Sequence, residues 1–132
     1  MKVFYTIGAI IIFMVTNSSC TKNSTSNSAG TADLTTATWR VSYYWDTKDE
    51  TSNFTDYVFM FSNTGVVMAH KGSTMITGTW SETGTKLTID FGSDPVLSAI
   101  SKKWLKTETT STVVKMKDDN TSQDDQLHLT KL

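Results

Sequence analysis

The feature of this sequence that most constrains its fold is an alternation with a period of two residues, in which successive side chains belong to opposite faces of a strand. Turn residues interrupt this alternation at intervals. Residues 57–61 place three aromatic side chains on one face and Val58 and Met60 on the other. Gly65 follows in an Asn-Thr-Gly turn, and turn residues recur about every ten residues along the chain. Because glycine tolerates the positive φ angles of tight turns, this rhythm predicts consecutive antiparallel hairpins, which form a β-meander.

Several segments have the composition of strands, since threonine, aromatic and β-branched residues dominate them and the chain has one proline. On the first strand, the alternation places Trp39, Val41, Tyr43 and Trp45 on one face, opposite Arg40, Ser42 and Tyr44. On the last strand, Leu127 and Leu129 are expected to face inward. The predicted strands are residues 39–45, 57–61, 66–69, 74–81, 86–91, 105–117 and 126–132.

One segment departs from this alternation. Apolar residues from Val96 to Trp104 recur at helical spacing, Asp94 can cap exposed N–H groups, and Pro95 suits a first helical position. We therefore predict an all-β fold, an antiparallel meander barrel of about seven or eight strands, because closure removes unpaired edges. It carries one short helix of about two turns near residues 95–103.

The N-terminal segment predicts export. Lys2 precedes Val3–Val15, a run of 13 residues that is apolar apart from Thr6. A membrane-spanning helix needs about 20 apolar residues, so this run matches a secretory signal instead. The following Asn-Ser-Ser-Cys20 resembles a lipobox, although Asn17 departs from its usual leucine-like residue. The resemblance implies cleavage after residue 19 and acylation of Cys20.

Two alternatives stay open for Cys20, the only cysteine in the chain. It is either the acylated anchor of a bacterial lipoprotein or a free exported thiol, which an oxidising compartment disfavours. In the first case, acyl chains on Cys20 make the membrane a partner. Residues 1–19 are then the signal, 20–33 the lipidated cysteine with a flexible polar tether, and 34–132 one barrel domain. The resemblance implies the outer membrane. In lipoproteins of this type, acidic residues soon after the cysteine often accompany export to the surface; residues 21–28 contain none, so the resemblance favours the periplasmic face.

Charge excludes one class of partner. The chain carries 12 basic and 13 acidic residues, and Arg40 is its only arginine. Nucleic-acid binding depends on clustered Lys and Arg, which the sequence lacks, so no nucleic acid is expected. We expect a monomer.

Five segments of the domain carry a likeness to a known family through their order and spacing: residues 34–41, 59–65, 78–81, 86–89 and 127–132. With them, residues 34–132 resemble the small lipocalin-like domains of lipoproteins from Bacteroidetes-type bacteria. The resemblance implies a calycin-type barrel and possible binding of small apolar ligands. Lipocalins proper carry Gly-x-Trp on the first strand, whereas here Ala37-Thr38-Trp39 lacks that glycine and Gly78-Thr79-Trp80 falls in mid-chain.

The aromatic residues suggest either a pocket or a packed core. An eight-stranded barrel is just wide enough for its own side chains or one small ligand, and this domain has many large rings. We therefore expect the side chains of the domain to fill the barrel interior. The alternative is a shallow ligand pocket near one end of the barrel. The candidate ligand-binding residues are Trp39, Tyr43, Tyr57, Phe59 and Trp80.

Metal and catalytic sites are not expected. The acidic loop 118–125 offers oxygen ligands for calcium but lacks the central glycine and terminal glutamate of an EF-hand, and residues 46–50 form a second unpatterned acidic loop. Neither His70 nor His128 lies in a recognisable catalytic or metal-ligand motif, so both are expected to be structural. We expect no enzyme and no cofactor.

Two functions remain. The first is a membrane-anchored envelope lipoprotein that binds a small apolar or amphipathic molecule. The alternative is a non-enzymatic protein-interaction module of an envelope assembly, with Tyr44, Phe54, Val58 and Met60 as exposed apolar positions.

Overall fold

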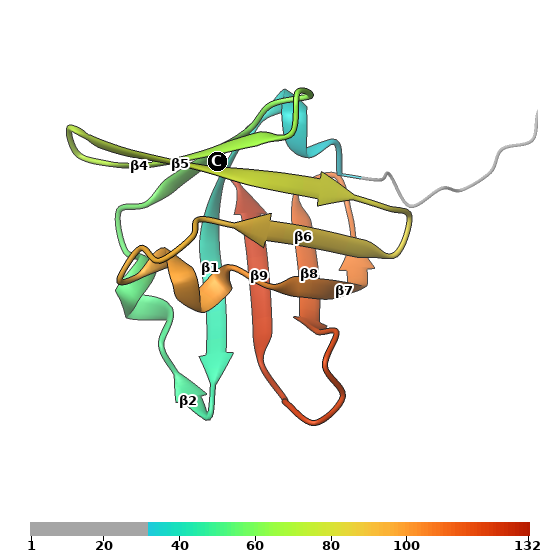
Figure 1. Cartoon of the computed structure of the whole chain (residues 1–132). Helices are drawn as coiled ribbons and strands as arrows, with labels where there is room; N and C mark the ends of the chain where they lie inside the picture. The colour runs from blue at the N-terminus through green and yellow to red at the C-terminus, as the bar shows by residue number, and fades with distance from the viewer. Residues whose placement is uncertain (1–31) are drawn as a thin grey trace, which may run out of the picture.

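Eight antiparallel strands close into a barrel in the computed structural model, which describes residues 32–132 (Figure 1). Each strand pairs with the next one along the chain, and β9 pairs with β1 to complete the ring. This confirms the predicted all-β, antiparallel, lipocalin-like meander barrel. The strands are β1 (Thr38–Asp46), β3 (Val58–Phe61), β4 (Val66–Lys71), β5 (Thr74–Glu82), β6 (Lys86–Asp90), β7 (Lys103–Thr109), β8 (Val113–Asp118) and β9 (Gln126–Lys131).

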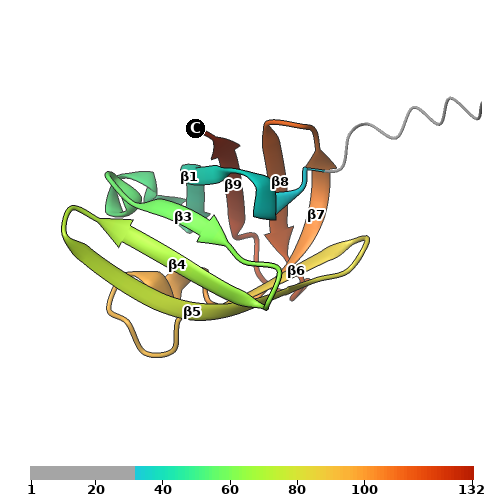
Figure 2. The same ribbon diagram turned by 90° about the horizontal axis from the view of Figure 1, so that it is seen from above.

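Short elements fill the connections. The two-residue strand β2 (Lys48–Asp49) folds back on the end of β1. Three 3₁₀ turns complete the structure: η1 (Leu34–Thr36), η2 (Thr51–Phe54) and η3 (Leu97–Ile100). Figure 2 shows β3, β4 and β5 running side by side along one wall, with β1, β9, β8 and β7 behind them.

The predicted facing of the first strand is wrong in its second half. A β-bulge shifts the register between Val41 and Tyr43 where β1 pairs with β9. An extra residue in one strand turns all following side chains to the opposite face. Trp39, Val41 and Tyr44 are therefore buried, whereas Tyr43 and Trp45 lie half-buried on the outer side.

The predicted strand 105–117 is two strands. Thr110 makes the turn between β7 and β8, because its backbone N–H donates to the Val113 carbonyl at 2.8 Å and its Oγ1 accepts from the Val113 N–H at 3.0 Å. Threonine hydroxyls can hold such turns without glycine or proline, which is why the usual turn residues are missing here.

The predicted helix near residues 95–103 is a single 3₁₀ turn. Asp94 caps it as expected, because its Oδ1 accepts from the N–H groups of Val96 and Leu97 at 2.9 and 2.8 Å. The turn ends early because the Ser101 hydroxyl donates to the Leu97 carbonyl at 2.8 Å and accepts from the Phe91 N–H at 2.8 Å. Trp104 then belongs to β7.

Large side chains occupy the barrel interior. Trp39, Tyr44, Phe59 and Trp104 are each at most 1 % exposed. The other large, fully buried side chains are aliphatic or thioether groups: Leu34, Leu87, Ile89, Leu97, Ile100, Met116, Leu127 and Leu129. This is the filled barrel that the sequence favoured, and the inward facing of Leu127 and Leu129 is confirmed.

The folded part begins slightly earlier than predicted. Ala32 is 4 % exposed, and the Asp33 carboxylate caps η1 by accepting the Thr35 N–H at 2.9 Å. Both residues were assigned to the tether. The predicted signal 1–19, Cys20 and residues 21–31 lie outside the described residues. Within residues 32–132, no helix has the length and apolar character needed to cross a membrane.

Candidate functional site: a hollow between β1 and β3

The barrel wall has a gap where β1 separates from β3. These two strands pair only through Thr38 with Met60 and Trp39 with Phe59. Beyond that point β1 continues alongside β9, and β2 pairs only with Trp45 and Asp46, so residues 40–44 of β1 have no strand partner on the side of β3. The η2 segment fills part of this gap.

Hydrogen bonds tie η2 to β1. The Thr51 Oγ1 accepts the Tyr44 N–H at 2.9 Å, and the Glu50 N–H donates to the Tyr44 carbonyl at 2.9 Å. The Asp49 carboxylate accepts the Thr51 N–H at 2.9 Å and so begins the turn. Phe54 is 2 % exposed and meets the Tyr44 ring edge-on, with 5.1 Å between centroids. This local turn therefore forms one wall of a concave surface.

The remaining space is a hollow of about 340 Å³, which we call the β1–β3 hollow. Its apolar lining comes from both strands, η2 and the last residue, and its rim carries hydroxyls and two opposite charges. The apolar lining residues are Val41, Phe54, Tyr57, Val58 and Leu132, and the polar ones are Arg40, Thr51, Ser52, Thr55 and Asp56. Apolar lining with a few polar groups is the usual chemistry of small-molecule sites.

Two further hollows have different linings. One, of about 450 Å³, lies between Asp33 and the β5–β6 turn and is lined by charged and small residues. The other, of about 420 Å³, lies along β5 and the end of β6, where Val66 and Phe91 are the only large apolar residues. The β1–β3 hollow therefore has more large apolar residues in its lining than either of the other two.

The five predicted ligand-binding residues are not gathered in one place. Tyr57 lines the β1–β3 hollow. Trp39 and Phe59 are buried in the core, each 1 % exposed. Trp80 lies half-buried, where its indole N–H donates to the Ser62 carbonyl at 2.8 Å and its ring meets Phe61 edge-on. Tyr43 lies on the outer wall against His128, with 4.9 Å between ring centroids.

Sequence reasoning missed Arg40 and Phe54 as site residues. Arg40 was noted only as the single arginine, and Phe54 was expected to be exposed. Tyr44 and Phe54, two of the four expected exposed apolar positions, are buried at 0 and 2 % exposure. Val58 is half-buried and Met60 is 39 % exposed. The signal that was missed is Asp49 two residues before Thr51. At this spacing the aspartate can cap a turn, and this turn directs Phe54 into the core.

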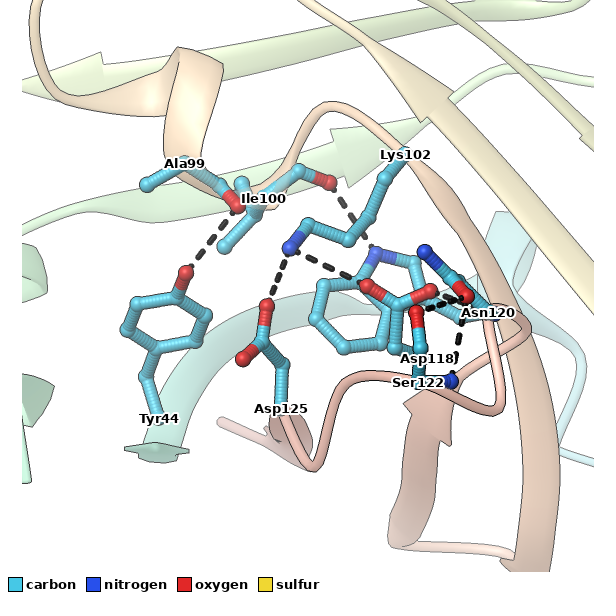
Figure 3. A network of polar contacts seen from close by, with 9 residues as sticks. Tyr44, Ala99, Ile100, Lys102, Asp118, Asn120, Ser122 and Asp125 are labelled. Carbon is cyan, nitrogen blue, oxygen red and sulfur yellow. Dashed lines mark hydrogen bonds and ion pairs between the residues drawn. The ribbon is translucent and has the colours of Figure 1, made fainter. Parts of the chain in front are cut away.

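The acidic loop 118–125 lies at one end of the barrel, and Figure 3 shows Lys102 beside two of its carboxylates, Asp118 and Asp125. Lys102 Nζ lies 3.2 Å from Asp118 and also pairs with Asp125, and these carboxylates are 8 and 5 % exposed as residues. Lys86 pairs with Asp119 at 2.8 Å. Burial alone would lower the pKa of Lys102, but the hydrogen bonds and charges of Asp125 and Asp118 outweigh it and raise that pKa.

This charged cluster links three elements. The Lys102 ammonium lies 5.3 Å from the centroid of the Trp104 ring, and the Trp104 indole N–H donates to the Ile100 carbonyl at 3.0 Å. The Tyr44 hydroxyl donates to the Ala99 carbonyl at 3.1 Å (Figure 3). Burial, followed by the charge of Asp46 and other carboxylates, raises the pKa of Tyr44, so this hydroxyl stays a donor. The contacts of this cluster hold one end of the barrel together, so its role is structural.

The two histidines lie on opposite walls. His70 projects outward from β4, and His128 projects outward from β9 beside Tyr43. Burial, followed by the positive charge of Lys115, lowers the pKa of His128. Among residues 32–132, no three His, Cys, Asp or Glu side chains come together in a way that could hold a metal ion.

The fold defines the class of protein: a closed, eight-stranded, lipocalin-like antiparallel barrel. Two solved structures share it. A DUF4847 family protein from Bacteroides vulgatus superposes with a TM-score of 0.57 at 12% identity, over 74% of this chain and 94% of that chain. An uncharacterized protein from Bacteroides eggerthii gives a TM-score of 0.50 at 11% identity, over 73% and 98% of the two chains. At such identities the likeness shows the fold alone. The sequence matches no protein-family model and no curated protein.

Proposed function

We propose that this chain is a lipid-anchored lipoprotein of the bacterial envelope whose barrel binds a small apolar or amphipathic molecule in the β1–β3 hollow. The observation that carries the proposal is the apolar lining of this hollow next to the only arginine of the chain. In this proposal the domain acts as a non-enzymatic monomer, without cofactor or nucleic acid.

The volume and chemistry of the hollow indicate the ligand class. Its 340 Å³ lies at the low end of the roughly 300–1,000 Å³ typical of small-molecule pockets. Val58 and Phe54 offer apolar contact, and the exposed Arg40 guanidinium can bind a carboxylate or phosphate through two N–H groups. A short-chain amphiphile with an anionic head fits both features.

Dodecanoate and its neutral counterpart dodecanol test this idea. We expect saturable binding of both to the full chain carrying Cys20→Ser, measured by titration calorimetry. Val58→Asp places a charge in the apolar lining and should weaken both ligands at least about tenfold. The matched control is Val66→Asp, a half-buried outward valine at the start of β4 that does not line the hollow.

Arg40→Gln separates the head-group contribution from the apolar one. It should weaken dodecanoate about tenfold and leave dodecanol unchanged, because a charge-assisted hydrogen bond contributes about 1.5–3 kcal/mol. The control is Lys103→Gln, which removes an exposed charge on β7. Absence of saturable binding, or equal affinity in Val58→Asp and the unchanged chain, would refute the ligand proposal.

The anchor has a separate test. Cys20→Ala should release the protein from the membrane fraction and abolish labelling by a radioactive fatty acid. A variant that remains membrane-bound and lipid-labelled would show that Cys20 is not the anchor. For the anchored, unchanged protein, protease accessibility in intact cells distinguishes the periplasmic face of the outer membrane, which we favour, from the cell surface.

The alternative function is a protein-interaction module within an envelope assembly. The interior supports it, since a barrel filled by its own large side chains offers a partner mainly its outer walls and loops. A partner that co-purifies at a fixed stoichiometry, combined with failure of the dodecanoate titration, would favour this alternative.

A further inference from the structure

Thioether and imidazole side chains gather on the outer face of β3, β4 and β5. Met60 lies directly opposite Met68 in the β3–β4 pairing, and His70 lies directly opposite Met75 in the β4–β5 pairing. Met68 and His70 are two residues apart on β4 and so share its outer face. We call these four residues the methionine–histidine face.

The register places these groups within reach of one ion. Directly opposed residues of antiparallel strands have Cβ atoms about 4.5–5.5 Å apart. Residues two apart on one strand lie about 6.6–6.8 Å apart. Methionine has three rotatable bonds and adapts its sulfur position readily. An ion above the midpoint of Met68 and His70 can therefore bind both, with a third ligand from Met60 or Met75.

The groups are available to solvent. Met75 is 55 % exposed, Met60 is 39 % exposed, and Met68 and His70 are half-buried. On β3 and β4 the buried positions are Phe59, Phe61, Val67 and Ala69, all of them apolar, so these methionines are not needed to fill the core there. Within residues 32–132, the His70 side chain takes part in none of the ion pairs.

The surrounding chemistry selects a soft cation. Thioethers are soft ligands that favour Cu(I), whereas Ca²⁺ and Mg²⁺ require oxygen ligands and Zn²⁺ prefers thiolate, imidazole and carboxylate. No carboxylate stands at the strand positions that directly adjoin the methionine–histidine face on the outside of the barrel. Those positions are Thr38, Val58, Val66 and Thr77.

We propose that the methionine–histidine face binds one soft monovalent metal ion, Cu(I), with Met68 and His70 as the central ligands and Met60 or Met75 completing the site. This site is separate from the β1–β3 hollow and does not depend on the ligand proposed there.

Ag(I) serves as the probe because it is soft, monovalent and stable in air. The test uses the full chain carrying Cys20→Ser, so that the thiol cannot compete, with calorimetry and NMR of ¹³C-methyl-labelled methionine. We expect one equivalent of Ag(I) to bind and to shift the methyl resonances of Met68 and of Met60 or Met75. The resonance of Met116, which is buried in the core, should not move.

Substitutions identify the ligands. Met68→Leu and His70→Gln keep the size of each side chain and should each weaken Ag(I) at least about tenfold. The matched controls are Met116→Leu and His128→Gln, which should leave the affinity unchanged. The same order of affinities is expected for Cu(I) in anaerobic competition with bathocuproine disulfonate.

Three results would overturn the proposal. The first is the absence of stoichiometric Ag(I) binding. The second is binding that survives Met68→Leu combined with His70→Gln, which would place the metal elsewhere. The third is an equal loss in Met116→Leu, which would indicate a general effect on the fold. Circular dichroism of each variant confirms that the barrel is intact.

Discussion

Gly78 has the least space for a side chain among the glycines of residues 32–132. A Cβ atom built there would lie 2.3 Å from the Asp90 carbonyl oxygen and 2.7 Å from Cδ1 of Phe91. Because the first of these neighbours is backbone, β5 or the end of β6 would have to move to accept any side chain. The Gly-x-Trp sequence at Gly78 therefore marks close contact between two strands, one of the uses of glycine inside strands.

Gly78→Ala should lower the free energy of unfolding by about 2–3 kcal/mol, since the added methyl group overpacks a position that cannot expand. Urea denaturation measures the change. Gly84→Ala is the matched control, because its Cβ would meet nothing within 4 Å, and its effect should be near zero. Similar losses in both variants would show that the β5–β6 contact is looser than described.

At the scale of elements, the β1 bulge decides which tyrosine the core receives. Tyr44 is fully buried and donates to the Ala99 carbonyl, whereas Tyr43 lies outside against His128. The two residues are adjacent and identical in type, so they form a natural pair for testing the register. An unbulged strand would bury Tyr43 instead.

Tyr44→Ala should cost about 3–5 kcal/mol of unfolding free energy, the loss typical of a large buried aromatic side chain. Tyr43→Ala should cost about 1 kcal/mol, since only an outer aromatic contact is lost. Thermal or urea unfolding of the two variants provides the comparison. A larger loss for Tyr43→Ala would contradict the bulge.

Much of the element order was predictable from the chain, and the exceptions have physical causes. Alternation around Phe59 and Leu127 located strands correctly, because each has one buried face. The β1 bulge was not predictable, since it depends on pairing with β9, which is distant in sequence. The Thr110 turn and η2 rely on side-chain hydrogen bonds of threonine and aspartate. These local bonds leave no trace in hydrophobic periodicity.

The candidate site was less predictable than the fold. Tyr57 was identified because aromatic residues mark apolar surfaces, and it lines the β1–β3 hollow. Arg40 and Phe54 were missed, since their meeting depends on how η2 turns back over β1. The methionine–histidine face was missed for a similar reason. Its residues come together only through the pairing register of three strands, which cannot be read from the sequence.

At the scale of the whole molecule, Lys102 closes one end of the barrel. Its ammonium joins Asp118 on β8 and Asp125 before β9 to the segment that follows η3. Its side chain is 25% exposed, so the attraction is only partly screened. Removing this single cation would leave two nearly buried carboxylates without an opposite charge, and Asp118 would keep only the Asn120 N–H, at 2.7 Å, as a donor.

Lys102→Met should therefore cost about 2–4 kcal/mol of unfolding free energy, as expected when one member of a mostly buried ion cluster is lost. The matched control is Lys103→Met, which removes the exposed neighbouring charge and should have little effect. Urea denaturation at pH 7 gives both values. Adding Asp125→Asn to Lys102→Met should recover part of the loss, and no recovery would argue against the ion cluster as its cause.

The pH dependence of this stabilisation has a definite sign. The pKa of Lys102 is raised above its ordinary value of 10.5, so the contribution is complete below pH 10.5 and is lost as the pH rises through the higher folded-state value. The difference in stability between the unchanged chain and Lys102→Met should stay constant from neutral pH to that point and shrink above it. A difference that already shrinks between pH 7 and pH 9 would contradict this assignment.

The β1–β9 pairing has a consequence for how the chain acquires its structure. The Thr130 hydroxyl donates to the Ser42 hydroxyl across 88 positions of sequence, and most of β1 has no other strand partner until β9 arrives. Contacts this distant in sequence are formed late and slowly, because the entropy of closing a long loop must be overcome first. Adding one hairpin after another therefore does not close the barrel. In a nascent or partly exported chain, β1 still has an unpaired edge, and folding becomes fully cooperative only when β9 pairs with β1.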